Sequence, residues 1–181
     1  PVRLTADRDA DPPELYYYSQ RFRAWSIANF FRKATGIVRE HYPATVPTTQ
    51  NFSDGAVYMA NMYMQGNDYF TWFRNKALDC ALSEDWTNLG VTHQLCGWNV
   101  GLLRAATKYH GQPIHMYVIT SYGRTPLVVK LKAYTDIMQG AKALSFFAFS
   151  PEYAGHERGW AERWEMYPAL AELTREIGAA E

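Results

Sequence analysis

The sequence predicts an α/β fold built on a parallel sheet, as a single domain over residues 1–181. Short apolar runs alternate with longer segments in which apolar residues recur every three or four positions, which is typical of alternating strands and helices. The expected strands begin near Ala44, Ala77, Pro113 and Ala141, close to the roughly 31 residues per unit of a (β/α)8 barrel of about 250 residues. Apolar runs of this kind fit parallel strands covered on both faces. The rhythm therefore predicts a (β/α) half-barrel.

Composition argues against several classes of partner. The chain is 48% hydrophobic, so it can bury a sizeable core. Its formal net charge of +0 argues against nucleic acid as the main partner. No apolar run approaches the roughly 20 residues of a membrane-spanning helix, so no membrane partner is expected. The two cysteines, Cys80 and Cys96, form neither a disulfide framework nor a metal-ligand spacing, and we expect no metal and no cofactor.

A long helix is expected first, from Leu15 to about His41. Asp11 would be its N-cap, and Pro12 would occupy the first helical position. Pro43 ends the helix because it cannot continue the hydrogen-bond pattern. Apolar residues at steps of three and four predict one buried stripe along this helix: Phe22, Trp25, Ala28, Phe31, Ala34 and Val38.

The first strand is expected over residues 44–52, where threonine and valine supply β-propensity. Pro47 argues against a fully central position in the sheet. Gln50 and Asn51 would lie at the carboxyl end of this strand. A long loop over residues 53–67 follows, and loops of this length in compact domains are often functional.

The second strand, expected over residues 77–85 after a short helix at 68–76, contains the most informative stretch. Its apolar run ends abruptly in Glu84, Asp85 and Trp86. Chemistry in parallel α/β folds collects at the carboxyl ends of strands. These three residues are therefore candidates for a functional role. The alternative interpretation is that one carboxylate only caps the strand or the following turn.

The remaining elements continue the alternation. Tyr122 and Arg124 follow the third strand and Glu152 follows the fourth, so they would reach the same edge of the sheet as Glu84. The expected elements are, in order, a helix at 92–109, a strand at 113–120, a helix at 125–140, a strand at 141–149 and a helix at 160–177.

Four short motifs recur in the order and spacing of a known family. A long helix leads to TTQNF at residues 48–52, which is similar to a "P-x-x-P-V-T-T-N-F" strand, and DYFTW at 68–72 resembles the next helix. GQPI at 111–114 resembles a "G-K-P" strand opening, and QGA at 139–141 resembles an "H-G-A" entry to the last strand. From about residue 20 to 155, the chain resembles the barrel of glycoside hydrolase family 42.

This resemblance implies that the chain is the carboxyl half of a TIM barrel, strands five to eight, and a fragment of a longer catalytic domain. The family's domain is a retaining glycosidase whose acid/base glutamate ends strand four, which would precede Pro1. Its nucleophile is a glutamate that ends strand seven. Here the matching position falls near Val118 and has no carboxylate, so the chain departs from the family pattern at that point.

Glycoside hydrolysis needs two carboxyl groups that flank the scissile bond. Glu84 is the candidate catalytic residue, as a displaced nucleophile or base that works with an acid outside this chain. The alternative is that Glu84 or Asp85 holds substrate hydroxyls or an arginine such as Arg124. Trp86 and Tyr122 would offer aromatic faces for a sugar ring. The candidate substrate-binding residues are Asp85, Trp86, Gln50, Asn51, Tyr122, Arg124 and Glu152.

Three functions remain open at this point. The first is hydrolysis of O-glycosidic bonds in a β-linked oligosaccharide. The second is a catalytically inactive carbohydrate-binding barrel, which the absent strand-seven glutamate favours. The third is a scaffold half that assembles with a partner, because half a barrel has two unpaired sheet edges. That partner would be the other half of the barrel or a second copy of the chain.

Overall fold

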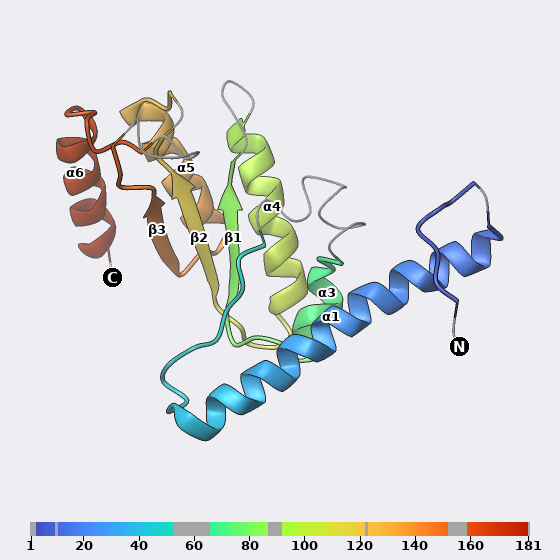
Figure 1. Ribbon diagram of the computed structural model, residues 1–181. Coiled ribbons are helices and arrows are strands. Elements are labelled where there is room, and N and C mark those ends of the chain that lie inside the picture. The colour runs from blue at the N-terminus through green and yellow to red at the C-terminus, as the bar shows by residue number, and fades with distance from the viewer. Residues whose placement is uncertain are drawn as a thin grey trace.

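The computed structural model describes residues 3–9, 11–52, 66–86, 92–121, 123–151 and 159–180, with the backbone alone at 92 and 93. It confirms the α/β class with a parallel sheet (Figure 1). The three strands are β1 (Ala81–Asp85), β2 (Ile114–Ile119) and β3 (Ala143–Phe147), hydrogen-bonded in that order. The arrangement is that of a partial (β/α) fragment.

Helices α4 (Thr92–Thr107) and α5 (Pro126–Gln139) connect the three strands, and α6 (Met166–Gly178) follows them. Both connecting helices contact β2. Two cores result. One joins α3 (Tyr69–Arg74) and α4 to the first two strands, and the other joins α5 and α6 to the second strand around Val118.

The register of the strands decides which side chains share a face of the sheet. Glu84 of β1 pairs with Tyr117 of β2, which pairs with Ser145 of β3. Successive side chains of a strand point to opposite faces. Val118 packs against α5, so its row, which includes Asp85, faces the helices. The row that contains Glu84 therefore faces away from α4 and α5.

Helix α1 (Pro13–His41) corrects two predictions. Its N-cap is Pro12 rather than Asp11, and no side chain caps it. The predicted stripe is buried only in part: Ala28 is fully buried, whereas Phe22 and Trp25 are 45% and 51% exposed.

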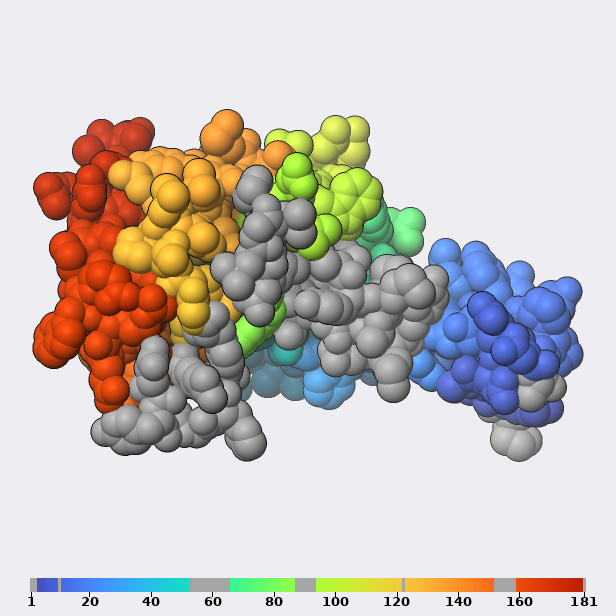
Figure 2. All heavy atoms as spheres, turned by 90° about the horizontal axis from the view of Figure 1, so that it is seen from above, coloured from blue at the N-terminus to red at the C-terminus, as the bar shows by residue number. Residues whose placement is uncertain are grey.

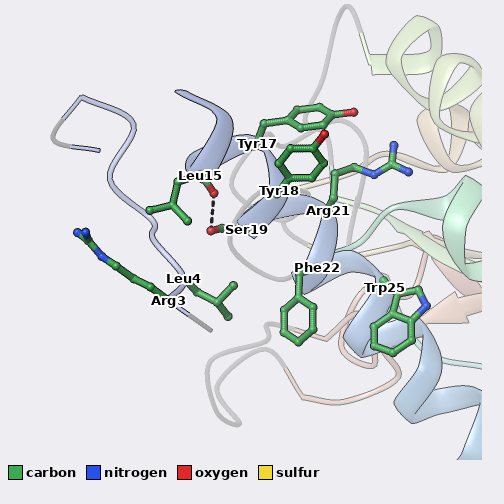
Figure 3. Close-up of a pocket in the computed structure, with 9 residues that line it drawn as sticks. All are labelled: Arg3, Leu4, Leu15, Tyr17, Tyr18, Ser19, Arg21, Phe22 and Trp25. Atoms are coloured by element: carbon green, nitrogen blue, oxygen red, sulfur yellow. Dashed lines mark hydrogen bonds between the residues drawn. The ribbon is translucent and has the colours of Figure 1, made fainter. Parts of the chain in front are cut away.

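The reason lies in the placement of α1. Its amino-terminal half projects beyond the sheet and the other helices (Figures 1 and 2). There it contributes Phe22 and Trp25 to a hollow of about 610 Å³, together with Leu4 of the preceding segment (Figure 3). Helical periodicity identifies the residues that share a face, but it does not say how much of that face another element covers.

The strand expected over residues 44–52 is not formed. The segment makes one isolated parallel bridge, between Asn51 and Leu82. Pro47 has no backbone N–H and so cannot donate a hydrogen bond to a neighbouring strand. The Thr48 carbonyl accepts hydrogen bonds from the backbone N–H groups of Asp79 and Cys80, at 3.0 and 3.1 Å, and these two donors lie in the turn before β1. The described part of the chain therefore has three strands rather than four, although this segment still places Asn51 beside β1.

The remaining boundaries agree with the sequence to within a few residues, apart from two late starts. Strand β1 begins at Ala81 rather than residue 77, and α6 begins at Met166 rather than residue 160. Thr125 caps α5 and Gly140 ends it with a φ of 115°, which agrees with the helix predicted over residues 125–140. Most of the predicted loop, residues 53–65, lies outside the described residues. Within the described ranges, no helix combines the length and the apolar character that crossing a membrane requires.

Candidate functional site

Glu84 lies near the carboxyl end of β1 with only 5% of its surface exposed. The side-chain amide of Asn51 donates a hydrogen bond to Oε1 of Glu84. The indole N–H of Trp86 donates to Oε2. Asn51, which the sequence suggested from a separate segment, is thus brought to Glu84 and Trp86, and the Glu84 carboxylate is held from both sides by neutral donors.

Aromatic rings lie beside this carboxylate on the same face of the sheet. The rings of Trp86 and Phe147 meet edge to face, with centroids 5.7 Å apart. Tyr117, the register partner of Glu84, has its ring centroid 5.9 Å from that of Phe147. All three rings are half-buried. A carboxylate beside partly open rings offers both a hydrogen-bond acceptor and an apolar platform.

The same face also carries a polar pair farther from the strand ends. His115 Nε2 lies 2.8 Å from Ser145 Oγ. Burial lowers the pKa of His115, which favours the neutral imidazole. Sequence reasoning missed Tyr117, Ser145 and Phe147 as neighbours of Glu84. Strand alternation puts each on one of two faces, but only the register shows that they share a face with Glu84.

Asp85 lies on the opposite, helix-facing side of the sheet. Its Oδ2 is 2.6 Å from Lys132 Nζ of α5, and both side chains are 1% exposed. The structure therefore separates Asp85 from Glu84, although the two are adjacent in sequence. The sequence-based alternative paired one of these carboxylates with Arg124, whereas the cation beside Asp85 is Lys132.

Arg124 is buried and hydrogen-bonds to backbone carbonyl groups at the ends of two strands. Its guanidinium donates to the carbonyl oxygen of Trp86 at 3.0 Å and to that of Ser121 at 3.1 Å. The Arg124 carbonyl in turn accepts a hydrogen bond of 2.6 Å from Arg163. This predicted site residue is thus connected to Glu84 through Trp86.

Of the other predicted substrate-binding residues, the structure describes Gln50 and Asn51 but not Tyr122 and Glu152. Gln50 is half-buried, and its side-chain amide donates to the Asn51 carbonyl at 3.1 Å. Gln50 and Asn51 both line a cavity of about 480 Å³ bounded by α1 and Trp72. Tyr122 and Glu152 lie outside the described residues, so their predicted roles stay predictions.

A second buried cluster lies behind β1, between α4 and α5. Cys96 Sγ is 2.7 Å from Asp136 Oδ1. Burial raises the pKa of Asp136 to about 8 and also raises that of the Cys96 thiol. The two cysteines, Cys80 and Cys96, are free and buried. Among the residues that the structure describes, no group of three or more His, Cys, Asp or Glu side chains could hold a metal ion.

Comparison with known proteins agrees with the resemblance seen in the sequence. The family model for glycoside hydrolase family 42, described as beta-galactosidase, matches residues 9–165. A beta-galactosidase from Arthrobacter sp is 23% identical over 157 residues, which covers 77% of this chain but only 20% of that protein. No solved structure matches. Because the family model covers most of its length, the chain belongs to glycoside hydrolase family 42.

Proposed function

We propose that the full-length protein hydrolyses O-glycosidic bonds of a β-linked oligosaccharide, with β-galactosides as the first substrates to test. The observation that carries this proposal is the Glu84 carboxylate, held by Asn51 and Trp86 near the carboxyl end of a parallel strand. Membership of the family supports the reaction class, and the name of the Arthrobacter relative suggests the sugar.

Glu84 fits the role of nucleophile or base better than that of acid. Each of its oxygens accepts a hydrogen bond, so the local donors suit a carboxylate that accepts rather than one that donates a proton. A carboxylate has about four lone-pair sites, which leaves room for a sugar hydroxyl, a water or an anomeric carbon. The second carboxyl group that hydrolysis requires would come from a strand outside this chain, about 5–5.5 Å away for retention or 6.5–9.5 Å for inversion.

The rings of Trp86, Tyr117 and Phe147 would receive the apolar face of a sugar ring. Asn51 and Gln50 would hydrogen-bond its hydroxyls. In this proposal β1, β2 and β3 are strands six to eight of a TIM barrel, and residues 44–52 occupy the place of strand five. The edge strand β3 would then pair with a strand of the other half of the barrel or of a second copy.

A second candidate function is sugar binding without catalysis. Val118, near the position that matches the family's nucleophile, is fully buried and packs in the core with Val129 and Ala133. The position near which the family's nucleophile would fall is therefore occupied by an apolar side chain that packs in the core beside α5. A barrel that retains its carboxylate and rings but lacks this nucleophile would bind sugars and leave them intact.

Comparing wild type with Glu84→Gln in the full-length protein tests both candidates. A panel of aryl glycosides measures turnover, and calorimetry with galactose and cellobiose measures binding. A fall of about three or more decades in turnover, with folding and sugar binding intact, would place Glu84 in the chemistry. Glu172→Gln on α6 is the matched control, because its side chain is exposed and far along the chain from β1. Sugar binding without turnover in wild type would favour the non-catalytic candidate, and absence of both would refute the proposal.

A further inference from the structure

Two buried cations contact the two residues that follow Glu84 at the end of β1. Lys132 of α5 contacts the Asp85 carboxylate at 2.6 Å. Arg124, from the segment between β2 and α5, contacts the Trp86 carbonyl at 3.0 Å. The two residues that follow Glu84 are thus each held by a cation with almost no contact with solvent.

These contacts differ in kind from ion pairs on the surface of the same helix. Lys130 of α5 pairs with Glu176 of α6 at 3.1 Å, but both side chains are more than a third exposed. Surface pairs of this kind hold their partners weakly. The Lys132–Asp85 pair is buried from solvent. The attraction between two buried charges offsets their desolvation penalty only when their geometry is good. Moving Asp85 away from Lys132 would leave each buried charge without this partner, so this contact holds Asp85 against α5.

Arg124 fixes the next residue through a planar fork. One guanidinium nitrogen donates to Trp86 and another to Ser121, which follows β2. The ends of two neighbouring strands are thus tied together by one side chain. A lysine at this position would have a single ammonium group in place of the fork, so it would not reproduce both contacts.

The consequence for Glu84 follows from Trp86. The indole N–H of Trp86 donates to Oε2 of Glu84, so any shift of the Trp86 backbone moves the donor that holds this carboxylate. Asn99 of α4 adds a third contact from the helix side, to Ser83 Oγ at 3.1 Å. Residues 83 and 85 are therefore anchored from the helix side of the sheet and residue 86 through its carbonyl oxygen, while the Glu84 side chain faces away from the helices.

We propose that Lys132 and Arg124 are positioning residues for Glu84, because they fix Asp85 and Trp86 and so aim the Trp86 indole at the carboxylate. This inference rests on the proposed function of Glu84. Both side chains are only 1% exposed, so neither is placed to bind substrate directly. A displacement of about 1 Å at a reacting group is enough to cost about a hundredfold in rate.

The first test is a substrate-free measurement of the Trp86 environment. Full-length protein containing 5-fluorotryptophan is followed by ¹⁹F NMR, and Trp86→Phe assigns the Trp86 resonance. In wild type, Glu84→Gln should move this resonance, because the acceptor of the indole N–H changes. In Arg124→Lys the resonance should move or broaden, and its response to Glu84→Gln should shrink. An unchanged resonance with an unchanged response would overturn the proposal.

Lys132 needs a variant that avoids a buried, unpaired charge. Lys132→Met alone leaves the Asp85 carboxylate without this partner, so the double variant Lys132→Met with Asp85→Leu removes the pair together. The double variant should fold and still shift the Trp86 resonance. Lys130→Met on the same helix and Arg175→Lys on α6 are the matched controls and should leave it in place. A shift in the controls equal to that in the double variant would overturn the assignment to Lys132.

Kinetics then connect the geometry to the proposed function. With 4-nitrophenyl β-galactoside, Arg124→Lys and the double variant should lower kcat about 10- to 100-fold and change KM by less than about threefold. A purely structural role would instead leave kcat per folded molecule unchanged, and this result would overturn the proposal. If wild type has no turnover and no affinity for galactose, the proposed function fails, and the ¹⁹F result still decides whether the two cations aim Trp86 at Glu84.

Discussion

The Asp136 carboxyl group should make the folded protein less stable as the pH rises. Asp136 is fully buried behind β1, 2.7 Å from Cys96, and burial raises its pKa from 3.8 to about 8. The nearby Asp85 carboxylate also raises this pKa, whereas Lys132 lowers it. Between the two pKa values the unfolded chain releases the proton and the folded chain retains it. The folded state then binds more protons than the unfolded state, so the free energy of unfolding falls with increasing pH.

The size of this effect follows from the difference between the two pKa values. Each pKa unit corresponds to 1.36 kcal/mol, so the rise of the Asp136 pKa from 3.8 to about 8 makes its contribution to the free energy of unfolding about 6 kcal/mol. The loss begins near pH 4, continues through pH 8 and is complete above it. A decrease of this size is a large share of the roughly 5–15 kcal/mol that stabilises a typical domain.

Urea denaturation of wild type and Asp136→Asn, at half-unit steps from pH 5 to pH 9, measures the effect. The asparagine cannot ionise and keeps an oxygen that can accept from Cys96. The difference between the two proteins removes the contributions of all groups that titrate alike in both, such as His115, whose lowered pKa acts in the opposite direction. We expect the wild type to lose stability relative to the variant by several kcal/mol across this range. A difference independent of pH would refute the reasoning.

Three further predictions concern stability, measured by urea denaturation near neutral pH. Lys132→Met should cost about 3–5 kcal/mol because it leaves the Asp85 carboxylate buried without this partner, whereas Lys130→Met should cost at most about 1 kcal/mol; equal costs would contradict this. Trp72→Ala should cost about 3–5 kcal/mol, since the ring is 1% exposed, and a cost near zero would show that the site lies outside the folded core. Thr125→Ala should cost about 1 kcal/mol through loss of the cap on α5, and restoration by Thr125→Ser would confirm that mechanism.

Local signals in the sequence predicted much of the fold. Thr125 and Pro126 begin α5, and Gly140 ends it in a left-handed conformation, because these residues act through their own backbone geometry. The prediction of a strand at 44–52 is wrong because the Thr48 carbonyl of this segment accepts hydrogen bonds from the turn at Asp79 and Cys80, not from a neighbouring strand. Sequence patterns do not contain that contact. The exposed Trp25 has the same explanation, since its helical face lacks a covering element among the described residues.

The candidate site was predictable only in part. The abrupt end of an apolar run predicted Glu84 at the carboxyl end of a strand, where the structure has it, and Asn51 and Trp86 contact its carboxylate. The ring of Phe147 beside Trp86 was not predicted, because the two residues belong to segments that are far apart in the sequence and meet only across β2 in the folded sheet. The Lys132–Asp85 pair was missed for a related reason: every residue of β1 is buried, so polarity alone could not tell its two faces apart.

The alternation of side chains along the strands decides which carboxylates can serve chemistry here. Glu84 and Asp85 are neighbours in sequence, but they belong to opposite faces and to different partners. Val118 shares the row of Asp85 through the register of β1 and β2. A glutamate at position 118 would therefore meet the apolar core beside α5, where ionisation is costly. A carboxylate at position 117, in the same row as Glu84, would face the rings instead. If this protein hydrolyses glycosides, the alternation favours Glu84 over any residue at position 118 as the group that acts.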